Sequence, residues 1–181
     1  MQIDISALKS IFNPKLRPLI GLDISSTSVK MVELVEAKGK PRIERYAIEG
    51  LPRDAVVDGN IVGNQIEAVT ETIAKCWKRM GTSTRYVAMA LPASAVITKK
   101  IILPASLREI EMEMQVESEA NQYIPFALDE VNLDFQVIGP APSSPDEIEV
   151  LIAASRKEKV EDRVAVAESA GLKPRVLDVE S

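Results

Sequence analysis

The sequence contains no histidine, and its 181 residues include a single cysteine, Cys76. Catalytic triads and pairs that depend on a histidine, zinc sites with histidine ligands and disulfide frameworks are therefore excluded. Cys76 falls among the apolar positions of a helical pattern, so we expect it to be a small core residue. Any chemistry must rely on carboxylates, hydroxyls, lysines, backbone amides or a bound ligand.

Long apolar runs are also missing. The uninterrupted apolar stretches, such as 101–103, are only a few residues long, which is too short to span a bilayer. Met1 is not followed by a basic segment and a long apolar run, so no secretory signal is predicted. These features predict a cytoplasmic chain. With 46% apolar and 27% charged residues, the composition is that of a folded protein.

Charge is spread unevenly along the chain. Residues 1–100 hold 15 Lys and Arg against 10 Asp and Glu, whereas the remaining residues hold 7 against 17, and the net charge is −5. An acidic chain with only 4% aromatic residues is a poor candidate for nucleic-acid binding. The asymmetry predicts two differently charged surfaces on one body.

The first 17 residues form a separate segment, divided from the rest by Pro14 and Pro18. The apolar residues between positions 2 and 12 have a spacing compatible with a short amphipathic helix on a membrane. The segment is short and contains one basic residue in that stretch, so we expect a loosely packed N-terminal arm instead.

The remaining sequence alternates between strand and helix patterns. Predicted strands cover residues 19–24, 29–35, 42–50, 85–91, 95–103, 130–138, 147–154 and 173–179. Predicted helices begin at Asn64, Ser106 and Ser155, each followed three positions later by a glutamate (Glu67, Glu109 and Glu158) that completes a capping pair. Gly81 and Gly171 are predicted to end the first and third helices, and residues 52–63 and 139–145 are predicted loops. The order predicts an α/β or α+β fold with at least one mixed sheet.

Residues 21–30, GLDISSTSVK, form the segment with most chemical content. They predict a β-hairpin with an ionisable side chain in its first strand, and a buried carboxylate there is costly unless it is paired or hydrated. A tight turn of small hydroxyl residues presents amide and hydroxyl donors that suit a phosphate, and an aspartate beside it suits Mg²⁺ held through water. The candidate ligand-binding residues are Asp23, Ser25, Ser26, Thr27 and Lys30. The alternative is an Asx-type turn without a ligand.

This segment resembles the first phosphate motif of the actin-like ATPase superfamily, whose usual pattern is Asp-x-Gly-Ser/Thr. Ser25 stands at the glycine position, which argues against close contact with a γ-phosphate. Further stretches are similar to the PilM family of type IV pilus assembly proteins, and they cover residues 94–99, 119–126, 128–131, 170–172 and 176–180. Because of these stretches, the chain resembles that family over most of residues 18–181.

The resemblance implies an α/β fold: an actin-like (ribonuclease H-like) subdomain 1A with an inserted α+β subdomain 1C, together forming the first lobe only. Subdomain 1A is expected at residues 18–90 and 156–181, and subdomain 1C at residues 91–155. The second phosphate motif and the adenosine motif of the superfamily are not found in this sequence. ATP and Mg²⁺ are therefore expected for the longer protein and not for this chain, which we expect to be enzymatically inactive.

The resemblance also implies that the protein is a cytoplasmic adaptor at the inner-membrane platform for pilus assembly and twitching motility. Its expected partner is the N-terminal cytoplasmic peptide of PilN, bound in a groove between 1A and 1C, with other platform proteins and self-association as further possibilities. Membrane association would be peripheral and indirect, through PilN. Candidate peptide-binding residues are Gln122, Tyr123, Ile124, Pro125 and Phe126, whose alternative role is the core at the end of a helix.

Glu180 resembles the acidic residue that orients the attacking water in several members of the superfamily. It is therefore the candidate catalytic residue, and the longer protein is expected to be a weak ATPase at most. The alternative function is an actin-superfold ATPase or phosphotransferase, such as an FtsA-like filament protein, because a fold does not determine a function.

Overall fold

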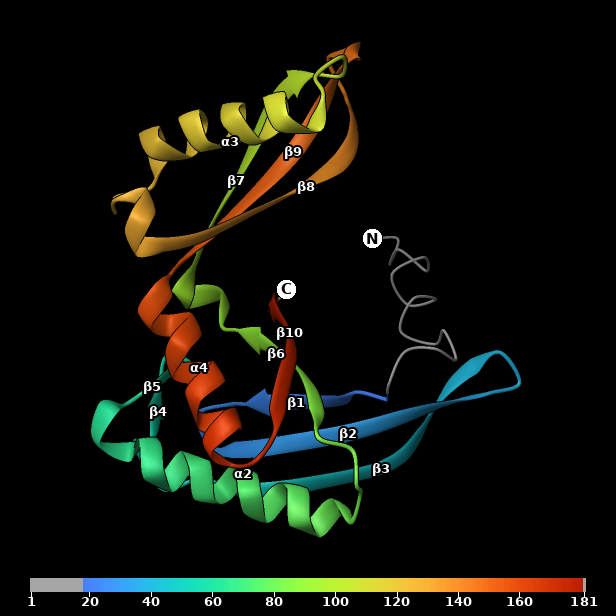
Figure 1. The fold of residues 1–181 in the computed structure, drawn as a ribbon, viewed down its shortest axis with the longest axis vertical. Helices are drawn as coiled ribbons and strands as arrows, with labels where there is room; N and C mark the ends of the chain where they lie inside the picture. Colours follow the sequence, from blue (N-terminus) through green and yellow to red (C-terminus); the bar gives the residue numbers. More distant parts are fainter. Residues whose placement is uncertain (1–17, 181) are drawn as a thin grey trace. The chain divides into compact units, whose positions relative to one another are not determined.

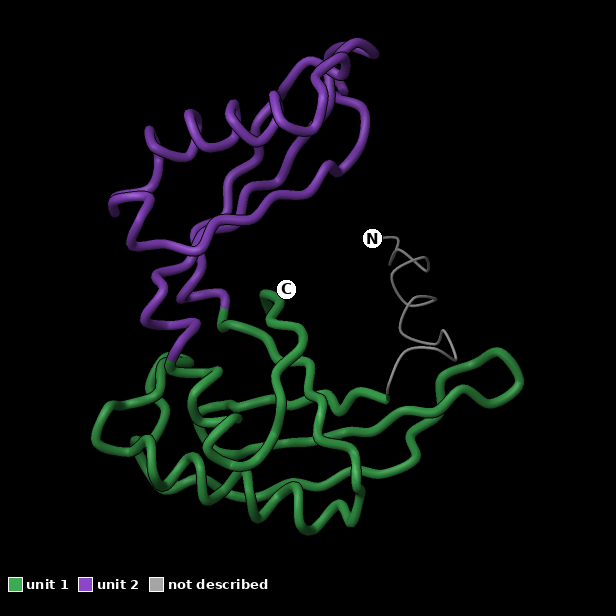
Figure 2. Tube along the Cα trace, viewed as in Figure 1, with its two compact units in different colours: residues 1–92, 162–181 green, residues 93–161 purple. Residues whose placement is uncertain are grey.

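The computed structural model describes residues 18–180 and divides the chain into two compact units. Unit 1 comprises residues 1–92 and 162–181, and unit 2 comprises residues 93–161 (Figure 2). The predicted N-terminal arm lies outside the described residues. Within residues 18–180, the helices are too short or too polar to cross a bilayer.

Unit 1 is built on a five-stranded mixed sheet (Figure 1). In spatial order its strands are β10 (Lys173–Val179), β6 (Tyr86–Leu91), β1 (Ile20–Ile24), β2 (Ser28–Ala37) and β3 (Lys40–Gly50). The hairpin predicted at the start of the chain is confirmed, because β1 pairs with β2 antiparallel, as β2 does with β3. β1, β6 and β10 are parallel to one another, so their C-terminal ends lie at one edge of the sheet.

One face of this sheet carries the core of unit 1. The alternating side chains of β1, β2 and β6 pack with those of α2 (Ile66–Met80) and α4 (Lys157–Ser169) in one buried cluster. Cys76 of α2 is fully buried in this cluster, which confirms its predicted core position. Burying one large aliphatic side chain contributes about 1.5–3 kcal/mol, so this face supplies most of the stability of unit 1.

Unit 2 is a three-stranded antiparallel sheet with one helix. β9 (Ser144–Arg156) is the central strand between β7 (Val96–Pro104) and β8 (Val131–Ala141), and α3 (Glu109–Tyr123) packs on the sheet. The buried residues of α3, Val116 and Ala120, are one turn apart and face the strands. Short 3₁₀ helices occupy Ala93–Ala95 (η2) and Leu128–Glu130 (η3).

The three predicted capping pairs are wrong, although all three helices exist. α2 follows a 3₁₀ turn (η1, Gly63–Gln65), and its N-cap has no side-chain hydrogen bond. The N-cap of α3 is Arg108, two residues after the predicted Ser106, and the Glu111 carboxylate accepts hydrogen bonds from the backbone amide and the guanidinium of Arg108. Ser155 is the penultimate residue of β9, where its hydroxyl donates to the carbonyl oxygen of Ala95 at 2.8 Å.

The predicted glycine stops are confirmed: Gly81 directly follows α2, Gly171 lies two residues after the end of α4, and their φ values are 63° and 87°. Left-handed φ values of this kind strain any other residue.

Both predicted loops contain strands. Residues 52–63 include β4 (Val56–Val57) and β5 (Asn60–Ile61), which pair with each other. At 139–145 the strands β8 and β9 continue almost to the tip of a tight hairpin, where Ala141 pairs with Ser144. Pro140 is tolerated because it lies at the end of an edge strand, beside a shift in register.

Candidate functional site

Asp23 lies near the C-terminal end of β1, on the sheet face opposite the core. Its neighbours Leu22 and Ile24 point into the core, and their exposed fractions are 3% and 1%. Asp23 pairs in register with Lys30 of β2, and the distance from Lys30 Nζ to Asp23 Oδ2 is 2.7 Å. Both side chains are about half exposed, so the cost predicted for a buried carboxylate does not arise.

The turn between β1 and β2 is closed by Ser25. The Ser25 amide donates to the carbonyl oxygen of Ser28 at 3.0 Å, and the Ser25 hydroxyl donates to the same oxygen at 2.9 Å. Within residues 18–180 the Asp23 carboxylate bonds to Lys30 and to no backbone amide, so the turn is not of the Asx type, and phosphate binding stays a prediction. Ser26 and Thr27 are exposed, and within residues 18–180 their hydroxyls form no hydrogen bond. The donors free for a ligand are therefore Ser26 and Thr27, whereas the Ser25 hydroxyl is used by the turn and Lys30 is paired with Asp23.

A buried cation lies behind this turn. Arg163 of α4 is 3% exposed, and its Nη2 donates to the carbonyl oxygens of Gly59 at 2.8 Å and Ile24 at 3.5 Å. Burial lowers the pKa of the Arg163 guanidinium, and the nearby carboxylates of Glu180 and Asp23 oppose that change. The end of β1 is thus tied to α4 and to the turn between β4 and β5.

Sequence analysis missed Arg163. The signal was present, because the buried positions of this segment are 163, 166, 167 and 170, the spacing of one helical face. A charged residue among three small apolar ones on such a face indicates a cation that is hydrogen-bonded in the interior.

Glu180 follows β10 at the same edge of the sheet. Its amide donates to the carbonyl oxygen of Leu91, the last residue of β6, at 2.9 Å. Because β1, β6 and β10 are parallel, Asp23 and Glu180 both come from strand C-termini. The structure therefore brings Asp23, Lys30, the Ser25–Thr27 turn and Glu180 to one edge of unit 1, around Arg163. Crevices at the C-terminal ends of parallel strands are the usual ligand sites of open α/β sheets.

A direct protein metal site is not part of this arrangement. Among the described residues, no group of three or more cysteine, aspartate or glutamate side chains could hold a metal ion. A single half-exposed carboxylate beside hydroxyl donors is compatible with a Mg²⁺ ion held through water and carried by a phosphate ligand.

The predicted peptide-binding residues lie in unit 2, at the end of α3 and in the segment that follows it. Ile124 is a buried core residue with 8% exposure, whereas the other four are exposed. Lys99 Nζ lies 4.4 Å from the centroid of the Tyr123 ring, and the guanidinium carbon of Arg156 lies 5.4 Å from that of the Phe126 ring. The side chain of Ile124 completes the core at the end of the helix, which is the alternative role given for this segment, and peptide binding by the five residues stays a prediction.

Comparison with known proteins decides the family. The family model of type IV pilus assembly protein PilM matches residues 21–181. The chain belongs to the PilM family. A solved PilM–PilN type IV pilus biogenesis complex contains a chain 32% identical to this one, with a TM-score of 0.79 over 92% of the present chain. The cytoplasmic domain of EpsL, an inner-membrane component of the type II secretion system of Vibrio cholerae, matches 90% of the chain with a TM-score of 0.55 at 13% identity, and this likeness is one of fold.

The expected fold class is confirmed: the PilM-family chain has a mixed α/β, actin-like ATPase fold. It spans about half of the PilM–PilN chain that it matches, 48% of that length, and 57% of the EpsL domain.

Proposed function

We propose that this PilM-family chain is an adaptor of the type IV pilus assembly platform that binds the N-terminal cytoplasmic peptide of PilN. The observation that carries the proposal is the 32% identity, over 92% of the chain, to a protein solved as a PilM–PilN complex. The chain would then be held at the inner membrane through PilN, on its cytoplasmic side. Other platform proteins, and further copies of the chain, would join through the same assembly.

The surface at the end of α3 supports this proposal. Tyr123 and Phe126 are exposed, at 49% and 37%, and each ring has a cationic side chain over it. Exposed aromatic rings next to a polar rim are typical anchors for a short peptide, because a ring loses little conformational entropy on binding. Ile124 would support the segment from below through its burial in the core.

We propose in addition that the β1–β2 turn contributes the phosphate side of an ATP site in the longer protein. Ser26, Thr27 and Lys30 would donate to phosphate oxygens, and Asp23 would orient water bound to Mg²⁺ once Lys30 turns to the phosphate. The metal would neutralise phosphate charge. Glu180, on the same sheet edge, would orient a water molecule, and Arg163 bonds to the end of β1 from behind the turn.

The proposal that the chain binds PilN is tested by measuring its binding to a labelled peptide with the sequence of the PilN N-terminus. Fluorescence anisotropy with the complete 181-residue chain should give a Kd in the micromolar range, about −8 kcal/mol. A short extended peptide on a preformed surface commonly binds with this affinity. A peptide of the same composition in scrambled order is the control. Equal binding of the two peptides, or none at about 100 μM, would refute the PilN assignment for this chain.

A further inference from the structure

α3 carries a second apolar stripe that faces away from the core of unit 2. Ile110 and Met114, one helical turn apart, are 72% and 67% exposed. The same helix face continues with the polar side chains of Glu117 and Asn121, at the i+3 and i+4 spacing. Two large exposed apolar side chains in one line on a short helix indicate a contact surface, because isolated ones are ordinary but aligned ones are not.

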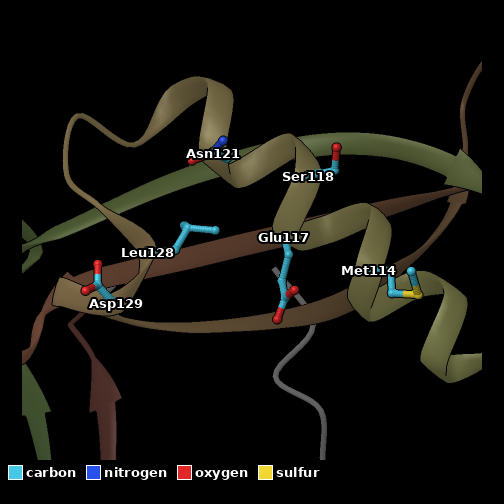
Figure 3. A pocket seen from close by; sticks show the side chains of 6 residues that line it. All are labelled: Met114, Glu117, Ser118, Asn121, Leu128 and Asp129. Atoms are coloured by element: carbon cyan, nitrogen blue, oxygen red, sulfur yellow. The ribbon is translucent and has the colours of Figure 1, made fainter.

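A pocket adjoins the C-terminal part of this helix face, from Met114 to Asn121. Its volume is about 430 Å³, and Figure 3 shows four lining residues along α3 and two on the segment that follows it. The lining residues are Met114, Glu117, Ser118, Asn121, Leu128 and Asp129. Met114 and Leu128 provide an apolar floor with a flexible thioether, a combination that adapts to aliphatic and aromatic side chains.

The surroundings of the pocket are acidic. Residues 106–130 contain seven carboxylates and one cation, Arg108. Arg108 is bonded to Glu111 at 2.7 Å, and Lys157 Nζ donates to the backbone carbonyl oxygen of Asp129 at 2.6 Å. Among the described residues the carboxylates of Glu117 and Asp129 form no ion pair. The surface made by Ile110, Met114, Leu128 and these two carboxylates, here the α3 surface, therefore fits a segment that is both apolar and basic.

We propose that the α3 surface binds the N-terminal arm of this protein, residues 1–17, from the same chain or from a second copy. The arm has the required chemistry: Leu8, Ile11 and Phe12 have the spacing of one helix face, and Lys9, Lys15 and Arg17 outnumber one acid, Asp4. The apolar side chains would enter the pocket over Met114 and Leu128, while the cations would lie near Glu117 and Asp129. The inference is independent of PilN and ATP binding.

The charges around the exposed apolar patches also explain why the arm would bind to the α3 surface. Another exposed apolar patch lies on β3 of unit 1, where Tyr46 and Ile48 are 72% and 52% exposed. The cations beside that patch, Lys30, Arg42 and Arg45, are each paired with a carboxylate, so the patch lacks the acidic excess of the α3 surface. Of the two patches, only the acidic one complements the arm.

Disulfide trapping in the complete chain tests the proposal. Ser10→Cys in the arm is combined with Ser118→Cys, which lines the pocket, and both substitutions are nearly isosteric. The matched control pairs Ser10→Cys with Ser169→Cys, an exposed serine of unit 1 at the end of α4. Cys76 is left in place because it is buried and its pKa is raised to about 11. Under mild oxidation the Ser118 pair should cross-link at least ten times faster than the control pair, and more slowly as salt is added.

A cross-link within one chain and one between two chains both support the proposal, because each places the arm on the α3 surface. Equal rates for the two pairs would overturn it. A second measurement uses methionine-methyl NMR of the chain with natural serines. Replacing Leu8, Ile11 and Phe12 together by serine should shift the Met114 methyl resonance and leave that of the buried Met89 unchanged. An unchanged Met114 resonance would also overturn the proposal.

Discussion

Arg163 donates a hydrogen bond to the carbonyl oxygen of Gly59 at 2.8 Å, across 104 positions of sequence. The same nitrogen also reaches the carbonyl oxygen of Ile24, the last residue of β1. Two carbonyl groups that lie far apart in the sequence thus share one buried donor. The relationship makes α4 part of the scaffold of the β1–β2 turn.

Replacing Arg163 by methionine should lower the free energy of unfolding of unit 1 by about 2 kcal/mol. The apolar stem is retained, but the carbonyl oxygens of Gly59 and Ile24 lose their donor, and a buried unsatisfied group costs about 1–3 kcal/mol. Urea unfolding followed by the fluorescence of Trp77, which packs against the core of unit 1, measures the change. Arg156→Met, at a side chain 47% exposed, is the control and should change stability by less than about 0.5 kcal/mol. Equal effects of the two substitutions would contradict a structural role for Arg163.

Cys76 should be unreactive in the folded protein at pH 8. Burial raises the pKa of its thiol from its ordinary value of 9.0 to about 11, and the charge of Glu49 acts in the same direction. The thiolate is therefore scarce, and the thiolate is the reactive form. Thiol labelling should proceed only after urea unfolds unit 1. Rapid labelling of the native chain at pH 8 would show that the thiol is accessible.

The same thiol makes stability depend on pH. Because the pKa is raised in the folded state, the unfolded chain loses the proton first, at about pH 9 and above. The free energy of unfolding should therefore fall as the pH rises from about 9 to 11, and this part of the fall should disappear in Cys76→Ala. An identical pH dependence in parent and variant would rule out this contribution.

Strands, helix stops and the β1–β2 hairpin were predictable because they rest on local patterns. β10 was predicted with its observed bounds. Gly81 and Gly171 end their helices with left-handed φ values, and glycine is the residue type that favours such values. Helix starts were not predictable, since a serine followed by a glutamate serves equally well in a strand. Ser155 is used by β9 and bonds to Ala95, a residue 60 positions away.

At the site, residue types were predictable but their bonding was not. Asp23, Ser25 and Lys30 were identified from sequence, yet the pairing of β1 with β2 decides that Lys30 takes the Asp23 carboxylate and that the Ser25 hydroxyl closes the turn. Arg163 reaches the site only through the packing of α4 on the sheet. Such long-range contacts leave little trace in a single sequence.

Asp23→Ala should weaken ATP binding at least tenfold, about 1.4 kcal/mol, in a PilM protein that contains this sequence and has the full length of its relative. The carboxylate would no longer orient water on Mg²⁺ beside Ser26 and Thr27. Folding should be little affected, because the Asp23–Lys30 pair is half exposed and such pairs contribute about 0–1 kcal/mol. Calorimetry measures the affinity, and circular dichroism checks the fold. Unchanged ATP affinity would remove Asp23 from the site.

The 181-residue chain itself should bind ATP only with a Kd near millimolar. Donors for the phosphate side are present on one turn, at Ser26, Thr27 and Lys30, so most of the nucleotide would remain in water. Losing several contacts of about 1 kcal/mol each brings a micromolar site to this range. Calorimetry with Mg²⁺ and ATP tests the value. A micromolar Kd would mean that unit 1 or unit 2 holds adenosine contacts not identified here.

Tyr123→Ala should weaken binding of the PilN peptide by about tenfold, because the proposed anchor ring is removed while the core residue Ile124 stays in place. Phe126→Ala should act in the same direction. The matched control is Tyr46→Ala, which removes an even more exposed tyrosine, 72% against 49%, from β3 of unit 1. Fluorescence anisotropy gives the three affinities under one set of conditions.

If Tyr123→Ala and Tyr46→Ala weaken peptide binding equally, the surface at the end of α3 is not the docking site. If neither changes an affinity that the parent chain shows, the peptide binds through other residues. A selective loss in Tyr123→Ala and Phe126→Ala, with unchanged unfolding transitions, is the outcome that the exposed rings under Lys99 and Arg156 predict.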